Sequence, residues 1–119
     1  MKKHNYKKLL IWQEARVLVK EIYLISKSFP EDERFGLTSQ IRRAIVSVSL
    51  NIVEGSGRVS DKDFANFLNM AYTSLLEVEG ILILIVDLEY YKEFELDSLN
   101  NKIEELLKMI YTFRENLLK

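Results

Sequence analysis

Residues 37–58 carry apolar side chains on two opposite faces of one predicted helix, and this feature limits most strongly what the chain can fold into. At about 3.6 residues per turn, one face forms a regular core stripe. Its members are Leu37, Ile41, Ala44, Ile45, Val48 and Ile52. The opposite face carries Val46, Leu50 and Val53, where a monomer would be expected to expose polar groups. We therefore expect this helix to pack within its own fold and also against a second copy of the protein.

A polar stripe runs along the same helix between the two apolar faces. It consists of Gln40, Arg43, Ser47, Asn51, Glu54 and Arg58. One interpretation is a hydrogen-bonded strip at a seam between subunits, in which Arg43 and Glu54 pair within or between chains. The other is a surface that contacts phosphate groups, because the planar guanidinium of arginine binds phosphate as well as carboxylate. The sequence leaves both interpretations open.

The charge of the chain is unevenly distributed, although its net value is only −1. Residues 1–62 carry twelve lysines and arginines against seven acidic residues, whereas residues 63–119 carry five against eleven. This asymmetry has two interpretations. Either the protein has a basic face that binds a polyanion, or its basic and acidic halves lie side by side and pair their charges. In the first case, the phosphate contacts would come from the stripe, its basic neighbours and a short basic N-terminal arm. These residues are Arg42, Arg43, Arg58, Lys62, Lys7 and Lys8, and the arm also holds Lys2 and Lys3.

Four stretches have the 3.6-residue apolar period of amphipathic helices. They are residues 9–28, 37–57, 61–88 and 97–118. The only proline, Pro30, ends the first, because the residue before a proline is disfavoured in the helical region. Helices of this length joined by short connections form an up-down-up-down four-helix bundle. We therefore predict an all-α fold in which all 119 residues belong to one domain.

The third predicted helix repeats the two-faced pattern of the second. Beside its core stripe it carries a second set of apolar residues, namely Ala65, Tyr72, Leu76 and Ile83. We expect the surplus apolar residues of the two helices to form an interface between copies of the chain. The interface residues are Val46, Leu50, Val53, Tyr72, Leu76 and Ile83. Residues 80–86 also have the β-branched content of a buried strand, but the helical period enters them without a break, so we predict helix there.

The ends of the predicted helices carry recognisable signals. Glycines in residues 55–57 predict that the second helix closes in a left-handed conformation. Ser60 and Asp97 are expected to be the N-caps of the third and fourth helices. Two aromatic residues of the first connection, Phe29 and Phe35, are expected to plug one end of the bundle.

The sequence lacks the residue sets that common catalytic and metal sites need. It has no cysteine, and we expect its single histidine, His4, to lie outside the bundle. Metal sites in bundles use Glu-x-x-His pairs, and helical-bundle ribonucleases commonly pair an arginine with a downstream histidine; neither pattern occurs. Glu77 and Glu79 are expected to be solvated surface carboxylates. We therefore predict that the protein is not an enzyme and uses no cofactor or metal.

Nothing in the sequence predicts secretion or membrane insertion. The N-terminal residues have neither the apolar run nor the cleavage site of a signal peptide. The longest unbroken aliphatic run, residues 81–86, is far shorter than the ~20 residues of a membrane span. We expect a cytoplasmic protein that does not contact a membrane.

A set of motifs spread over nearly the whole chain resembles a known family. The motifs are Leu10-x-Trp12-x-x-Ala15, Phe29-Pro30 with Glu33, Gly36-Leu37-Thr38-x-Gln40-Ile41-Arg42-Arg43-Ala44, Ser47-x-x-x-Asn51-Ile52-x-Glu54-Gly55-x-x-Arg58, and Phe64-x-x-Phe67-Leu68-x-x-Ala71-x-x-Ser74. Together they resemble the four-helix-bundle proteins of the 23S rRNA intervening-sequence protein family. Related accessory proteins of diversity-generating retroelements are similar too, and those are basic pentameric bundles that associate with a reverse transcriptase and nucleic acid.

The resemblance implies a left-handed up-down four-helix bundle that assembles as a ring, a homopentamer. It implies no settled biochemical activity. Arg42, Arg43 and Arg58 carry over as candidate contacts to nucleic acid, and Asn51 and Glu54 as structural residues of the same motif. Because the retroelement relatives are strongly basic and this chain has a net charge of −1, nucleic-acid binding would depend on a local patch.

Two functions follow from these observations. The first is a non-catalytic oligomer that associates with nucleic acid, RNA or DNA. The alternative is a protein-interaction scaffold that presents its surplus apolar faces to a partner protein and binds no nucleic acid. Salt-sensitive binding to RNA or DNA would favour the first function.

Overall fold

The structure is a computed structural model, and it describes residues 4–119 as four long helices. The helices are α1 (Leu10–Ser26), α2 (Leu37–Ser56), α3 (Asp61–Asp87) and α4 (Asp97–Leu117). Three short 3₁₀ turns accompany them, η1 (Tyr6–Lys8), η2 (Glu31–Glu33) and η3 (Glu93–Leu96). No strand occurs in the described part of the chain. The all-α four-helix prediction is confirmed, including helix through residues 80–86. Lys2 and Lys3 of the predicted basic arm lie outside the described residues.

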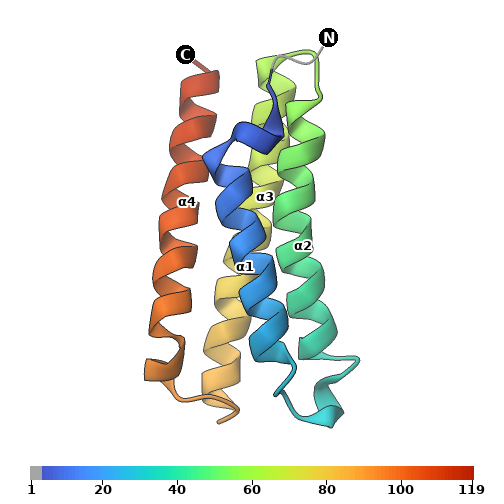
Figure 1. Cartoon of the computed structure of the whole chain (residues 1–119), viewed down its shortest axis with the longest axis vertical. Helices are drawn as coiled ribbons and strands as arrows, with labels where there is room; N and C mark the ends of the chain where they lie inside the picture. The colour runs from blue at the N-terminus through green and yellow to red at the C-terminus, as the bar shows by residue number, and fades with distance from the viewer. Residues whose placement is uncertain (1–3) are drawn as a thin grey trace.

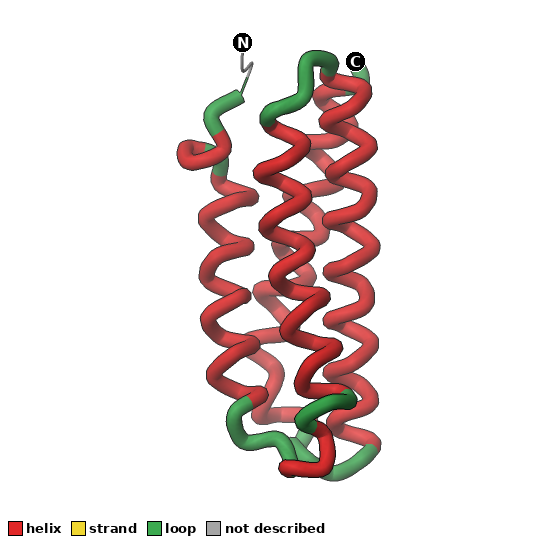
Figure 2. Tube along the Cα trace, turned by 90° about the vertical axis from the view of Figure 1, so that its right-hand side faces the viewer, coloured by secondary structure: helices red, strands yellow, loops and turns green. Residues whose placement is uncertain are grey.

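The helices alternate in direction, so that α1 begins and α4 ends at the same end of the bundle (Figure 1). Each helix packs against the next along the chain, and α4 closes against α1. The result is a rod of 46 × 25 × 20 Å (Figure 2). We call the end that holds η1 and residues 57–60 the terminal end. The opposite end, which holds residues 27–36 and 88–96, is the loop end.

The buried core follows the predicted stripes closely. Fully buried side chains from all four helices meet along the bundle axis, among them Leu18, Ile45, Leu75, Ile85 and Ile103. Ala65 departs from the prediction, because it is buried within the protomer and does not lie on an outer face. Phe67 of α3 is half-buried.

The helix ends show which of the predicted caps and closures form in the structure. Ser60 is the N-cap of α3, and its hydroxyl accepts the Asp63 N–H at 3.1 Å, as expected. Asp97 is not a cap but the first residue of α4, because η3 runs directly into that helix and places Leu96 at the cap position. The predicted left-handed closure of α2 is also wrong. Gly57 has a φ of −88°, and its N–H donates to the Glu54 carbonyl in an ordinary right-handed last turn.

His4 lies against the bundle, contrary to the expectation that it would lie outside. Its ring makes edge contacts with Phe64 and Phe113, with centroids 5.0 and 6.0 Å away. Its Nε2 lies 3.5 Å from the Asp61 carboxylate. His4 lies over the terminal end because these two phenylalanines offer its ring an apolar surface.

The loop end is closed by tyrosines from the third connection, residues 88–96, which the sequence did not indicate. Phe29 is buried as predicted, against the rings of Tyr90 and Tyr91. The Tyr91 hydroxyl donates to the Ile25 carbonyl at 3.1 Å. With the end filled by these rings, no space remains for Phe35. That side chain is 88% exposed, so its predicted role as a plug is wrong.

Glu33 joins the two connections of the loop end. Its carboxylate accepts the Leu37 backbone N–H at 3.1 Å, which satisfies a donor at the start of α2, and the Tyr90 hydroxyl at 2.7 Å. The hydrogen bond from Leu37 first, and that from Tyr90 second, hold the pKa of Glu33 below its ordinary value of 4.5. A carboxyl group whose pKa is lowered by folding stabilises the fold while it is ionised, and this contribution disappears as the pH falls through the lowered value.

Replacing Glu33 with glutamine is expected to lower the Tm at neutral pH and to make the acid-side fall in Tm shallower. The amide keeps the shape of the side chain but loses the charge that strengthens both hydrogen bonds. Thermal unfolding followed by circular dichroism between neutral pH and pH 3 checks this. Glu31→Gln in the same 3₁₀ turn is the control, because Glu31 only pairs with exposed Arg34 at 3.8 Å. Identical pH profiles for the two variants would contradict the prediction.

In the part of the chain that the structure describes, α3 alone is long and apolar enough to cross a membrane by length and composition. A helix that packs into the core of a protein can meet the same criterion of length and composition, and α3 packs against both α2 and α4.

Candidate functional site

The polar stripe of α2 lies along its seam with α3 within one protomer. Gln40 Nε2 donates to the Glu77 carboxylate at 3.2 Å. The Ser47 and Ser74 hydroxyls are 3.0 Å apart. Asn51 Nδ2 donates to the Ser47 carbonyl at 2.9 Å. Half of the stripe is therefore a strip of hydrogen bonds within the chain, and Glu77 of α3 is part of it.

Arg43 and Glu54, the charged members of this stripe that lie on α2, are exposed. They do not pair with each other, and the described residues give neither side chain an ion pair or hydrogen bond. Beside Arg43 the surface forms a polar hollow of about 500 Å³ that is lined in part by Gln40, Ser47 and Glu77. Arg43 is thus available to a group outside the protomer.

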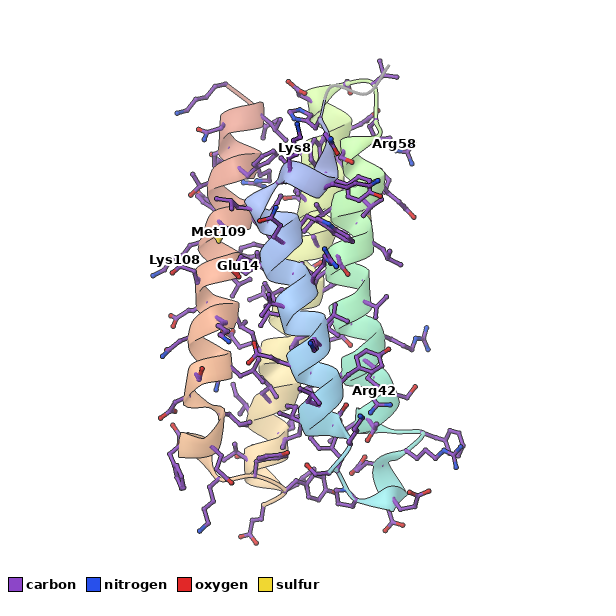
Figure 3. All side chains as sticks on the ribbon, in the orientation of Figure 1. Lys8, Glu14, Arg42, Arg58, Lys108 and Met109 are labelled. Atoms are coloured by element: carbon purple, nitrogen blue, oxygen red, sulfur yellow. The ribbon has the colours of Figure 1, made fainter. Side chains whose placement is uncertain are left out.

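The predicted phosphate contacts fall into two separate groups, which the sequence did not distinguish. Lys8 and Arg58 lie at the terminal end, whereas Arg42 lies towards the loop end (Figure 3). At a rise of about 1.5 Å per residue, about 20 Å of α2 lies between Arg43 and the end of the helix at Ser56, and Arg58 lies beyond that end. The basic residues of the stripe therefore form no single continuous surface.

The terminal group is exposed but loosely organised. Lys7 and Lys8 lie on η1, and Lys62 lies in the first turn of α3. The Arg58 guanidinium lies over the Phe67 ring, 4.5 Å from its centroid. Lys62 is flanked by Asp61 and Asp63, which reduces the local positive potential.

The loop group surrounds a second hollow of about 480 Å³, which we call the arginine hollow. Its lining includes Arg34, Arg42 and Arg43, the aromatic residues Tyr23 and Phe35, and two hydroxyl-bearing residues, but no carboxylate. Three arginines line this recess and no carboxylate does, although Arg34 also lies 3.8 Å from the exposed carboxylate of Glu31. This arrangement favours an anionic ligand.

Arg42 is held in a fixed position within this hollow. Its Nε donates to the Ser26 hydroxyl at 2.8 Å, and the guanidinium lies 4.7 Å from the centroid of the Tyr23 ring. Stacking on the ring favours the cation and restrains its plane. The guanidinium is therefore oriented before any ligand arrives.

Sequence reasoning identified Arg42 and Arg43 but missed Arg34, Tyr23 and Phe35. The sequence signal for Arg34 and Phe35 was an arginine followed by an aromatic residue directly before a predicted helix. The contribution of Tyr23 could not be found from the sequence, because it depends on how α1 packs against α2.

The residues predicted to form an interface between copies are partly or largely exposed in the protomer. Leu50 is 51% exposed, Leu76 is 42% exposed and Ile83 is 60% exposed. Val46, Val53 and Tyr72 are half-buried. The interface itself stays a prediction, and the exposed apolar surface that it requires is present on both α2 and α3.

Among the described residues there is no group of three or more histidine, cysteine or acidic side chains that could hold a metal ion. The Glu33 and Tyr90 pair, whose pKa values both shift from their ordinary values, is accounted for by the hydrogen bonds that close the loop end.

Comparison with known proteins places this geometry in a family. The chain is similar to a crystallised protein of unknown function from the S23 ribosomal protein family of Bacteroides thetaiotaomicron. The two are 27% identical, superpose with a TM-score of 0.81, and the match covers 88% of this chain and 98% of the other. No curated protein matches the sequence. The family model described as 23S rRNA-intervening sequence protein matches residues 7–112, and the chain therefore belongs to that family.

Proposed function

We propose that the protein is a non-catalytic, cytoplasmic oligomer that associates with RNA through the arginine hollow at its loop end. The observation that carries this proposal is the convergence of Arg34, Arg42 and Arg43 on one recess whose lining has no carboxylate. Such a recess supplies the positive potential that the whole chain, with its net charge of −1, does not. The description of the family, which connects it with 23S ribosomal RNA, supports RNA as the polyanion.

The proposed oligomer buries the outer apolar faces of α2 and α3, and the family resemblance favours a homopentamer. Exposed Leu50 on α2 and exposed Leu76 and Ile83 on α3 support an assembly, because apolar surface left in water commonly marks a protein interface. A ring would also repeat the arginine hollow once in every subunit. An RNA strand that contacted several hollows at once would then bind more tightly than an RNA strand that contacts one hollow.

A partner protein is the alternative ligand, and one observation favours it. Leu84 and Met70 on α3 are exposed in addition to the predicted interface residues, so α3 offers more apolar surface than that prediction uses. An assembled protein that binds no RNA at low salt and co-purifies with one protein in fixed stoichiometry would support this alternative.

Removing two charges from the arginine hollow is expected to weaken RNA binding. The double variant Arg42→Ala with Arg43→Ala should lose affinity, and the slope of log K against log salt should decrease in magnitude by about 1 to 2, because up to two fewer phosphates are neutralised. Fluorescence anisotropy of a labelled RNA across a salt series, at a known oligomeric state, measures both quantities.

Lys20→Ala with Lys108→Ala is the matched control for this experiment. It removes the same charge from exposed positions on α1 and α4, and neither residue lines the hollow. The same loss of affinity in both double variants would mean that only net charge matters. Undiminished binding by a correctly assembled Arg42→Ala, Arg43→Ala variant would remove the hollow from the proposed function.

A further inference from the structure

Phe35 is the most exposed of the large apolar residues, and its surroundings distinguish it from an ordinary surface phenylalanine. It lies between η2 and α2, 88% exposed. It lines both the polar hollow of about 500 Å³ and the arginine hollow of about 480 Å³, so its ring separates two recesses. Leaving so much apolar area in water is unfavourable, and the closed loop end shows that the fold does not need this ring in its core.

A second phenylalanine at the same end provides a direct comparison. Phe94 on η3 is 69% exposed, but its chain neighbours are Glu93 and Glu95. Phe35 instead follows Arg34, whose guanidinium lies 5.3 Å from the centroid of the Phe35 ring. Of these two phenylalanines, only Phe35 therefore combines an exposed ring with nearby arginines, since Arg34 lies against one side of the ring and Arg43 lines the same two hollows.

This combination matches the chemistry of an unpaired nucleotide. A nucleotide has a flat aromatic base and an anionic phosphate, and proteins bind single strands by stacking bases on aromatic side chains while basic residues follow the backbone. In a duplex each base is already stacked on its neighbours, so its face is not accessible to a side chain. An exposed aromatic ring beside arginines therefore favours single-stranded over double-stranded RNA.

We propose that Phe35 stacks on an unpaired base of single-stranded RNA whose adjacent phosphates bind Arg42 and Arg43. This inference rests on the proposed function and specifies the form of RNA that the arginine hollow takes. Arg42, held by Ser26 and Tyr23, supplies a fixed anchor for one phosphate, while Arg34 remains on one side of the Phe35 ring and leaves the other side to the base.

The test compares a labelled, unstructured RNA of about 12 nucleotides with the same strand annealed to its complement. For the single strand, Phe35→Ala is expected to raise the Kd about tenfold or more, the usual effect of removing one stacking platform. The salt slope should not change, because stacking releases no counterions. Phe35→Tyr should retain the wild-type Kd, since it keeps the ring. Wild-type protein should bind the duplex more weakly than the single strand.

Phe94→Ala is the matched control and should bind like the wild type. Both phenylalanines are exposed, so loss of helicity, checked by circular dichroism, is expected in neither variant. If Phe35→Ala binds the single strand normally while Arg42→Ala with Arg43→Ala does not, base stacking is wrong and RNA association stands. Equal or tighter binding of the duplex would likewise overturn the inference alone. If the wild type binds neither RNA at low salt, both proposals fail, and Phe35 becomes a contact for a protein partner.

Discussion

Replacing Gly55 with valine is expected to lower the free energy of unfolding by about 1–3 kcal/mol, the usual range for an overpacked core. Gly55 lies near the end of α2, where Phe64 and Phe67 of α3 lie directly against it. A Cβ at this position would lie 2.6 Å from Cδ1 of Phe64 and 2.8 Å from Cβ of Phe67, distances that real side chains do not reach. Since a Cβ cannot rotate away, α2 and α3 would have to separate. Urea unfolding followed by circular dichroism measures the change.

Gly57→Ala, two residues further along, is the control for this prediction. A Cβ there would make an ordinary contact of 3.6 Å with the Glu54 carbonyl oxygen, and the φ of −88° suits any residue. The expected effect is a gain of about 0.4–1 kcal/mol, because alanine restricts the unfolded chain more than glycine does. If Gly55→Val unfolds at the same urea concentration as the wild type, the close crossing of α2 and α3 is wrong.

Leu50→Asp is expected to break the proposed assembly into folded protomers. Within the protomer this side chain is 51% exposed, so a carboxylate reaches water and the bundle stays intact. At an interface between copies, the same carboxylate would be buried without a partner, and an unpaired buried charge costs several kcal/mol. Light scattering after size exclusion gives the mass of the assembly, and circular dichroism confirms that the protomer is folded.

Leu24→Asp is the matched control, because Leu24 is 56% exposed on α1, outside the predicted interface. It should leave the assembly mass unchanged. An intact assembly in Leu50→Asp would show that the outer face of α2 is not an interface. Dissociation in both variants would place the contact elsewhere on the bundle, or show that any added charge disrupts it.

The helices were predictable because helical periodicity is a property of near neighbours in the chain. Residues 80–86 illustrate this, since their composition alone suggests a strand. Ile81, Leu82 and Ile85 nevertheless continue the apolar face that begins at Phe64, and all three are buried in α3. Local hydrogen bonding was predictable where both partners lie within one turn, as at Ser60 and Asp63.

The candidate site was only partly predictable. The spacing of Gln40, Ser47 and Asn51 placed them on one face of a helix, and that was correct. The spacing could not show that Glu77 and Ser74 of α3 would complete their hydrogen bonds. It also could not show that Arg42 on α2 and Arg58 just beyond the end of that helix would lie towards opposite ends of the molecule with different surroundings.

The sequence by itself determined four amphipathic helices, their buried faces and an excess of apolar surface on two of them. Tertiary structure alone decided which aromatic residues close the ends. Tyr90 and Tyr91 fill the loop end and leave Phe35 in water, while His4 folds back onto Phe64. The requirement for glycine at position 55 also comes from the tertiary structure, because a Cβ there would collide with the Phe64 ring of α3. The physical reason is that periodicity determines the direction in which a side chain points from its own helix. The contacts of that side chain depend on the distance and angle at which another helix packs against it.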